Sequence, residues 1–217
     1  MFADTSSSTS VLTGRTGQKR WMSVIAVVLF SLVFAVPAAI AAPQAELWAR
    51  WEAHAPDSSA QVDHSAWGAF MDAYLITDHP TGVSRVDYAA VTSTDRAALD
   101  QYVGRLEETP VSSLNRDEQL AYWLNLYNAA TVQLILDNYP VDSIRDIRPG
   151  VFASGPWDMK LLEVEGEAMS LNDVEHRVIR PIWRDQRIHY AVNCASYGCP
   201  DLYPEPLTAE NWNRVFN

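Results

Sequence analysis

The two cysteines of the chain lie close together near its C-terminal end. Cys194 and Cys199 are separated by four residues, Ala195 to Gly198, in a stretch that is typical of a loop. In an exported protein such a pair is expected to form a disulfide. Alternatively, Cys199 is a nucleophile on an exposed loop, because a thiolate attacks carbonyl groups readily. Zinc binding by both thiols with histidine, or two inert buried thiols, also remain open.

Two histidines precede the cysteines and could serve as a general base. His176 directly follows Glu175, and His189 lies shortly before Cys194. An imidazole within hydrogen-bond reach would favour the thiolate form of Cys199. We expect no help from Glu175 in orienting His176, because neighbouring side chains on an α-helix point in different directions. The alternative for each histidine is an ordinary packed or surface position.

Polar side chains also lie where apolar ones are expected. Asn125 and Asn128 are three residues apart on an otherwise apolar helix and so lie on roughly one face. A buried amide without partners is costly, so we expect both to bind the backbone of a nearby loop. The alternative is that one of them orients a catalytic histidine or binds substrate. The basic run of Arg177, Arg180 and Arg184 is expected to pair with carboxylates, and recognition of an anionic substrate is the alternative.

The longest element that could position these residues is a helix over residues 116–138, where apolar side chains recur at helical spacing behind two acidic residues. Similar spacing predicts helices from residue 65 and over 94–106, the latter capped by Ser93 or Thr94. Residues 86–88 are expected to form a short strand, and residues 161–169 a hairpin around Glu165-Gly166.

The elements closest to the cysteines are a helix and a strand. Ser170 with Asp173 resembles a capping box, and the helix that it starts should end or kink at Pro181. Residues 188–194 are apolar and β-compatible enough to predict a buried strand that leads into the cysteine loop. A further helix should follow Thr208, but the sequence stops before it has two full turns.

These elements predict the α+β class: a mostly helical single domain with a small β-sheet over residues 65–217, preceded by a short helix and linker over 42–64. The composition, 48% hydrophobic and 20% charged, suits such a domain. Because the last helix is so short, we expect part of the domain to be missing at the C-terminus.

The first 41 residues have the features of a signal peptide. A polar start ends in Lys19-Arg20, an apolar run follows to Val36, and the small residues after Pro37 fit the A-x-A cleavage rule at residues 39–41. The protein is therefore expected to be exported, most simply to a periplasm, with transient membrane contact during export. An uncleaved membrane anchor is the alternative, because the apolar run approaches the ~20 residues that span a bilayer.

The charge of the chain excludes one class of partner. The whole chain carries −11 and residues 1–41 carry +2, so the remainder carries −13, with Lys160 as its only lysine. Such a surface repels phosphate backbones and offers no basic stripe. We expect no nucleic-acid partner; other partners are unknown, and no cofactor is predicted.

Three blocks of the sequence, read in order, resemble the family called domain of unknown function 547. They are YWLNLYNA at 122–129, SLNDVEH at 170–176 and IHYAVNCASYGCP at 188–200, and the resemblance extends from about residue 65 to the end. The family continues beyond the point where this chain stops and brings no established activity. The resemblance marks the following positions for testing: Asn125, Asn128, Glu175, His176, His189, Cys194 and Cys199.

The leading hypothesis is a thiol-dependent hydrolase or acyl-transferase of the cell envelope. Cys199 would attack a carbonyl, His176 or His189 would transfer the proton, and Asn125 or Asn128 would orient the base. Papain-like and transglutaminase-like enzymes are a distant analogy, since their cysteine precedes the histidine and here it follows both.

Two other hypotheses do not require a free thiol nucleophile. In the first, the chain is a non-enzymatic binding or scaffold domain whose loop is closed by a Cys194–Cys199 disulfide. In the second, both cysteines bind a metal together with His176 and His189. The sequence leaves open whether the protein is an enzyme.

Overall fold

The computed structural model describes residues 45–150, 153, 155–196 and 198–217; the predicted signal peptide lies outside them. Pro43–Asn217 makes up one compact unit. Its helical elements are η1 (Ala49–Glu52), α2 (Ser65–Tyr74), α3 (Ser93–Glu107), η2 (Val111–Ser113), α4 (Arg116–Asn138), η3 (Ile144–Asp146), the π-helix η4 (Asp173–Ile179), α5 (Arg180–Trp183), α6 (Ile188–Ala191) and α7 (Trp212–Val215). Strands β1 (Leu75–Ile76) and β2 (Arg85–Val86) pair antiparallel, as do β3 (Leu162–Val164) and β4 (Glu167–Met169).

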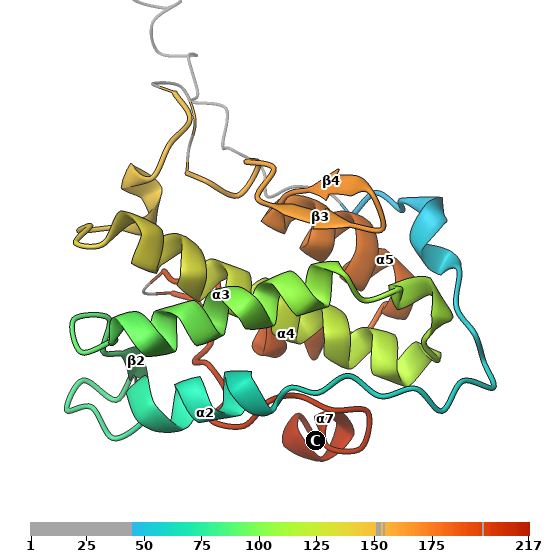
Figure 1. Ribbon diagram of the computed structural model, residues 1–217, viewed down its shortest axis with the longest axis horizontal. Helices are drawn as coiled ribbons and strands as arrows, with labels where there is room; N and C mark the ends of the chain where they lie inside the picture. The colour runs from blue at the N-terminus through green and yellow to red at the C-terminus, as the bar shows by residue number, and fades with distance from the viewer. Residues whose placement is uncertain (1–44, 151–152, 154, 197) are drawn as a thin grey trace, which may run out of the picture. The chain divides into compact units, whose positions relative to one another are not determined.

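This content confirms the α+β class, mostly helical with little sheet (Figure 1). Among the described residues, no helix has the length and apolar character needed to cross a membrane.

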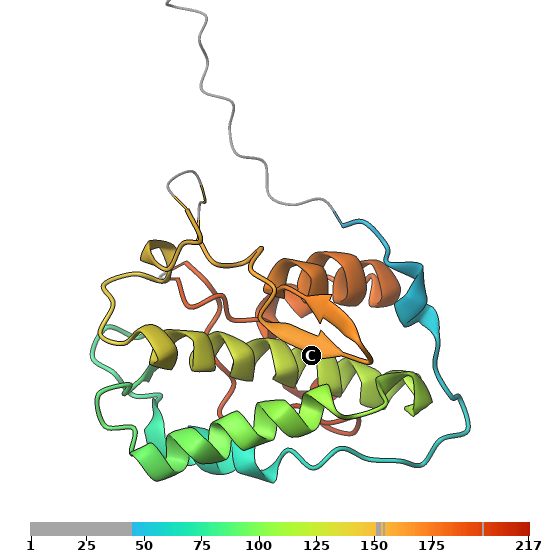
Figure 2. The same ribbon diagram turned by 45° about the horizontal axis from the view of Figure 1, so that its top comes forward.

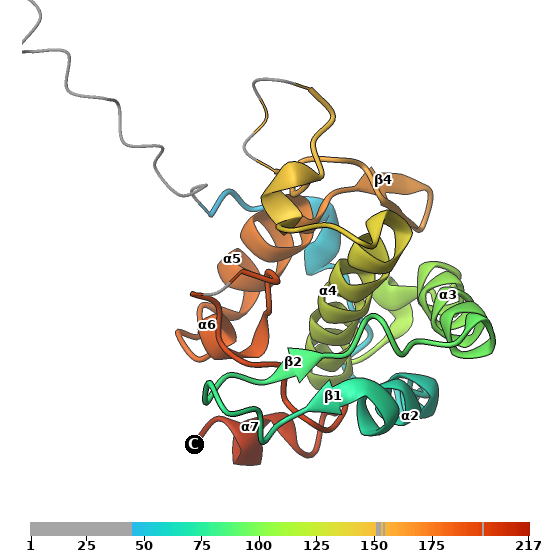
Figure 3. The same ribbon diagram turned by 90° about the vertical axis from the view of Figure 1, so that its left-hand side faces the viewer.

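Helix α4 is the centre of the domain and has the bounds that the sequence predicts. Asn115 caps it by accepting a hydrogen bond from the Glu118 amide, 3.0 Å away. Eighteen of its 23 residues are buried, because it packs against α3 and η2 and against η4. Figure 3 shows α4 with α3 on one side and α5 and α6 on the other. The helix therefore contacts several elements of the core and, through Asn128, the segment that leads into the cysteine loop.

The hairpin predicted around Glu165-Gly166 is confirmed. Both turn residues have positive φ, 47° and 79°, which is the conformation that a two-residue hairpin turn requires. The Glu165 side chain accepts hydrogen bonds from the amide and hydroxyl of Ser112, at 2.8 and 2.7 Å. Figure 2 shows the hairpin beside the η4–α5 helix.

The helix predicted after Ser170 forms, and of the end or kink expected at Pro181, the end does not occur there. Ser170 and Asp173 make the reciprocal capping hydrogen bonds, at 2.8 and 3.1 Å. The helix then widens into the π-helix η4 and continues through α5. Because Pro181 has no N–H to donate, the Arg177 carbonyl is free, and it accepts a hydrogen bond from the Trp48 amide at 2.9 Å. The N-terminal segment thus replaces the missing helix bond.

The strand predicted over residues 188–194 is wrong. Residues 188–191 form the short helix α6, and extended backbone begins at Val192. Ile188 and Ala191 are buried three residues apart, whereas the residues between them, His189 and Tyr190, are exposed. Burial at positions three residues apart is the spacing of one helical turn, and it outweighs the β-propensity of these residues.

Smaller differences concern helix ends. The helix expected early in the chain is the single 3-10 turn η1. The cap of α3 is Thr92, whose hydroxyl accepts from the Asp95 amide at 3.1 Å, rather than Ser93 or Thr94. The short strand expected at residues 86–88 overlaps β2 (Arg85–Val86) only at Val86. At the C-terminal end, Thr208 and Asn211 make reciprocal hydrogen bonds, and α7 starts only after them.

Candidate functional site

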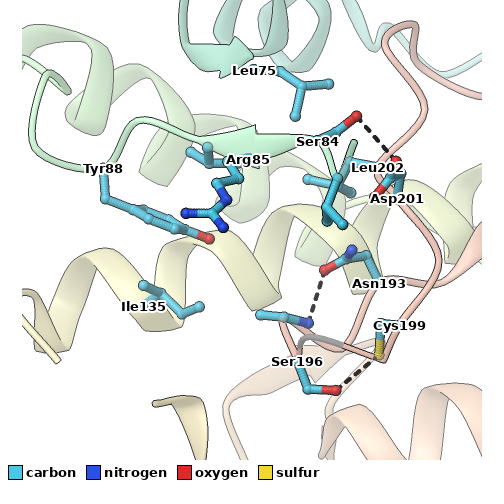
Figure 4. Close-up of a pocket in the computed structure, with 13 residues that line it drawn as sticks. Leu75, Ser84, Arg85, Tyr88, Ile135, Asn193, Ser196, Cys199, Asp201 and Leu202 are labelled. Carbon is cyan, nitrogen blue, oxygen red and sulfur yellow. Dashed lines mark hydrogen bonds between the residues drawn. The ribbon is translucent and has the colours of Figure 1, made fainter. Parts of the chain in front are cut away.

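The cysteine loop borders a pocket of about 310 Å³ that lies between it and the β1–β2 hairpin (Figure 4). Apolar side chains from several segments line it, among them Leu75, Ile135 and Leu202. The polar lining comes from the hairpin and from the loop, and includes Ser84, Arg85, Tyr88, Asn193, Ser196 and Asp201. A pocket of this size suits a small organic molecule.

The loop side of the pocket is held by Asn128 of α4. The Asn128 amide donates to the Ala191 carbonyl and accepts from the Asn193 amide, both at 2.9 Å. Asn193 in turn closes the loop: its side chain donates to the Pro200 carbonyl at 2.7 Å and accepts from the Ala195 amide at 2.8 Å. One wall of the pocket is therefore anchored to the central helix.

The second asparagine holds a segment further along the chain. Asn125, 1% exposed, donates to the Leu207 carbonyl at 2.6 Å and accepts from the Leu207 amide at 3.1 Å. The prediction that both asparagines bind loop backbone is thus confirmed, and neither side chain bonds to a histidine.

Cys194 and Cys199 are joined in a disulfide. The Cys194 amide donates to the Cys199 sulfur at 3.3 Å, and the Ser196 hydroxyl lies 3.3 and 3.4 Å from the two sulfurs. Cys199 lines the pocket. The disulfide alternative is therefore the one present, and in this form Cys199 is not a free nucleophile.

The candidate bases are not part of the pocket lining. His176 belongs to η4 and is half-buried, and His189 is exposed on α6. Of the positions marked for testing, the structure brings together Asn128 and the two cysteines, through Asn193. Glu175 and His176 form part of a separate cluster.

That second cluster lies on the π-helix. Glu175 accepts from Nε and Nη2 of Arg180 at 2.9 and 2.6 Å, a pairing between residues five apart that the π register favours. Nε2 of His176 lies 3.8 Å from the Glu175 carboxylate, beyond hydrogen-bond distance, so Glu175 does not hold the ring by a hydrogen bond. Burial lowers the pKa of His176, and burial and Glu175 raise that of Tyr127.

Two of the three arginines expected to pair with carboxylates do so. Arg180 binds Glu175, and Arg177 lies 3.1 Å from Asp173. The third, Arg184, donates to the Pro181 carbonyl at 3.2 Å.

The charged groups at the pocket are ones that the sequence analysis missed. Arg85 makes none of the ion pairs found within the described part of the chain, and its only side-chain hydrogen bond there is a long one to Thr81, 3.4 Å. Burial raises the pKa of Tyr88, which keeps its hydroxyl neutral. Asp201 accepts from Ser84 at 3.3 Å. Figure 4 shows Arg85 and Tyr88 toward one end and Asp201 toward the other.

The metal-binding alternative gains no support from this geometry. Within residues 45–150, 153, 155–196 and 198–217, no group of three or more His, Cys, Asp or Glu side chains is arranged to hold a metal ion.

Comparison with known proteins gives one match. Residues 111–217 match a family model described as "Protein of unknown function, DUF547". No curated protein and no solved structure matches the chain.

Proposed function

Since the chain belongs, through residues 111–217, to the DUF547 family, which carries no assigned activity, we propose from its own site that it is a binding domain for a small carboxylate-bearing solute. The proposed site is the pocket between the β1–β2 hairpin and the cysteine loop. The observation that carries the proposal is a guanidinium group on the pocket wall, that of Arg85, without a carboxylate partner among the ion pairs of the described residues.

The lining determines what such a solute would look like. The Arg85 guanidinium has a planar arrangement of donors that matches a carboxylate. Tyr88 adds a neutral hydroxyl, and the apolar walls suit a short hydrocarbon body. Asp201 at the other end accepts hydrogen bonds, so a ligand with an amino or hydroxyl group opposite its carboxylate fits best.

The test is a binding screen with a matched arginine control. Thermal melting of the purified chain is measured with a panel of small carboxylic, hydroxy and amino acids, and any ligand that raises the melting temperature is titrated calorimetrically. We expect Arg85→Gln to weaken binding by about tenfold or more, because a charge-assisted bidentate pair contributes ~1.5–3 kcal/mol. The control is Arg214→Gln, which removes another exposed arginine, and this variant should bind the ligand as tightly as the wild type does. Equal affinity of all three proteins, or no stabilising acid in the panel, would refute the proposal.

A thiol-dependent hydrolase or acyl-transferase has weaker support. Its nucleophile is bonded to Cys194, and neither candidate base lines the pocket. If the binding proposal is right, iodoacetamide leaves the unreduced protein unmodified, and amide and ester substrates are not turned over. Stoichiometric alkylation of Cys199 without reductant would favour the enzyme instead.

The proposal places the domain outside the cytoplasm, most simply in a periplasm. Two observations support this location. Residues 1–41 have the pattern of a signal peptide, and the Cys194–Cys199 pair forms a disulfide, as cysteine pairs do in an oxidising compartment. Intact mass spectrometry of the protein from cell fractions tests this. A periplasmic species that begins near residue 42 is expected, and an uncleaved species in the membrane fraction would support the anchor alternative.

A further inference from the structure

The Cys194–Cys199 disulfide closes a loop that is already closed without it. Asn193 bonds to the Pro200 carbonyl at 2.7 Å, which joins the two ends of the same loop, and Asn128 anchors Asn193 to α4. The disulfide encloses only residues 194–199, and a short ring constrains the unfolded chain less than a long one does. Stabilisation of the fold is therefore a weak explanation for its presence.

The surroundings of the sulfurs suit a bond that opens. Neither cysteine is fully buried, and Cys199 faces the pocket, where an incoming thiol can approach. The Cys199 sulfur accepts a hydrogen bond from the Cys194 amide at 3.3 Å, and the Ser196 hydroxyl lies 3.4 Å from it (Figure 4). Donors of this kind stabilise a thiolate more than a thiol, and so they lower the pKa of a cysteine released there.

We propose that Cys194 and Cys199 form a thiol–disulfide exchange site that oxidises a dithiol of a protein or small molecule. This activity is independent of the carboxylate-binding function proposed above. One thiolate of the dithiol attacks the Cys199 sulfur; a mixed disulfide forms and the Cys194 thiolate leaves, stabilised by a hydrogen bond from the Ser196 hydroxyl 3.3 Å away and later protonated by solvent. The second thiolate of the dithiol then attacks its own sulfur in the mixed disulfide and releases Cys199 as a thiolate.

The exchange balances in electrons and atoms. The dithiol loses two electrons and two protons and becomes a disulfide. The Cys194–Cys199 bond gains the two electrons, and each sulfur carries a proton once the thiolates are protonated. The reverse reaction would reduce a disulfide, so the direction depends on the dithiol supplied.

The test separates a reactive bond from a structural one by the acidity of Cys199. In the Cys194→Ser variant, thiolate absorbance is followed against pH, and the rate of mixed-disulfide formation with oxidised glutathione is measured at pH 7. We expect a thiol pKa at least about one unit below the ordinary ~8.5, which means about tenfold more thiolate at neutral pH. Adding Ser196→Ala should raise this pKa, whereas adding Ser93→Ala, an exposed serine of α3, should leave it unchanged.

The wild-type protein supplies the second measurement. Dithiothreitol should reduce the native protein without denaturant, and the reduced form should keep a cooperative melting transition. A Cys199 pKa at or above the ordinary value, no effect of Ser196→Ala, or reduction that requires unfolding would each overturn the proposal. Loss of carboxylate binding in Arg85→Gln leaves these results untouched, so the two proposals fail separately.

Discussion

The clearest quantitative expectation concerns the two asparagines of α4, because each binds a backbone that has little regular structure of its own. Asn125→Ala removes the partners of both the amide and the carbonyl of Leu207. Leu207 is 2% exposed, so water cannot replace them. Asn128→Ala leaves the Ala191 carbonyl and the Asn193 amide without partners. Here Asn193 is only half-buried, and water can compensate in part.

The magnitudes follow from the number of groups left unpaired. An unsatisfied buried group costs ~1–3 kcal/mol, so we expect Asn125→Ala to lower the free energy of unfolding by about 3–5 kcal/mol. For Asn128→Ala, with one half-buried group, about 2–3 kcal/mol is expected. In a domain of this size each kcal/mol corresponds to about 2–4 °C in melting temperature.

The control lies on the same helix. The Asn138 side chain is exposed and donates only to the Leu134 carbonyl of its own helix, at 2.8 Å. Asn138→Ala should change stability by no more than about 0.5 kcal/mol. Urea unfolding of the three variants, followed by circular dichroism, measures the differences, with similar m-values required for the comparison. If Asn125→Ala and Asn138→Ala proved equally mild, the asparagines would not position these segments and the reasoning would be refuted.

Three further outcomes follow from the buried charges and the disulfide. Burial opposes ionisation of Asp173, but Lys160 and neighbouring donors outweigh it and lower the pKa of this carboxyl to about 2. Ionised Asp173 therefore stabilises the fold fully above its unfolded pKa of ~4, and this stabilisation is lost as the pH falls to about 2. The free energies of unfolding of the wild type and of Asp173→Asn, measured with urea, should converge across that pH range. Burial lowers the pKa of His64 to about 4. Between about pH 4 and ~6.5 the unfolded chain therefore binds a proton that the folded chain does not, so the free energy of unfolding rises with pH in this range. The His64→Gln variant should show a smaller rise when thermal melts are measured over a pH series. Reduction of Cys194–Cys199 should lower the free energy of unfolding by only ~2 kcal/mol, the value for so short a ring, and a loss above ~4 kcal/mol in urea titrations would show that the bond is mainly structural.

Local sequence signals predict the elements that are long or that carry their own caps. Helix α4 is predicted to the residue because apolar side chains recur at helical spacing along its whole length, with two acidic residues in its first turn. The hairpin at Glu165-Gly166 and the capping pair Ser170–Asp173 are found because the interactions that define them lie within a few residues. These features depend little on the rest of the fold.

The predictions that fail concern residues whose local structure depends on contacts with segments far away in the sequence. Residues 188–191 are apolar enough for a strand, and only their packing against the core selects one turn of helix. Pro181 would end an isolated helix, but the amides of Glu46 and Trp48, more than a hundred residues earlier, bond to the carbonyls of His176 and Arg177. No local pattern contains that information.

The same distinction separates the parts of the candidate site. Cys194 and Cys199 are visible as a pair because they are neighbours in the sequence. Arg85, more than a hundred residues before Cys199, joins the pocket only because the β1–β2 hairpin folds back toward the loop. As an exposed arginine in a two-residue strand, it carries no signal that would distinguish it from other surface arginines.

The structure shows that two of the three sequence blocks that resemble the family are in direct contact. The first block carries Asn125 and Asn128, and the third carries the loop that Asn128 holds. The segment from Val192 to Asn211 has no helix or strand in its described residues, so its path must be fixed by side chains. The asparagines of α4 supply that restraint at two points, which means that the first block is needed for the third to keep its shape. Asn128 then acts on the pocket through Asn193, as a positioning residue, and its loss should disturb the pocket without removing any group that touches a ligand.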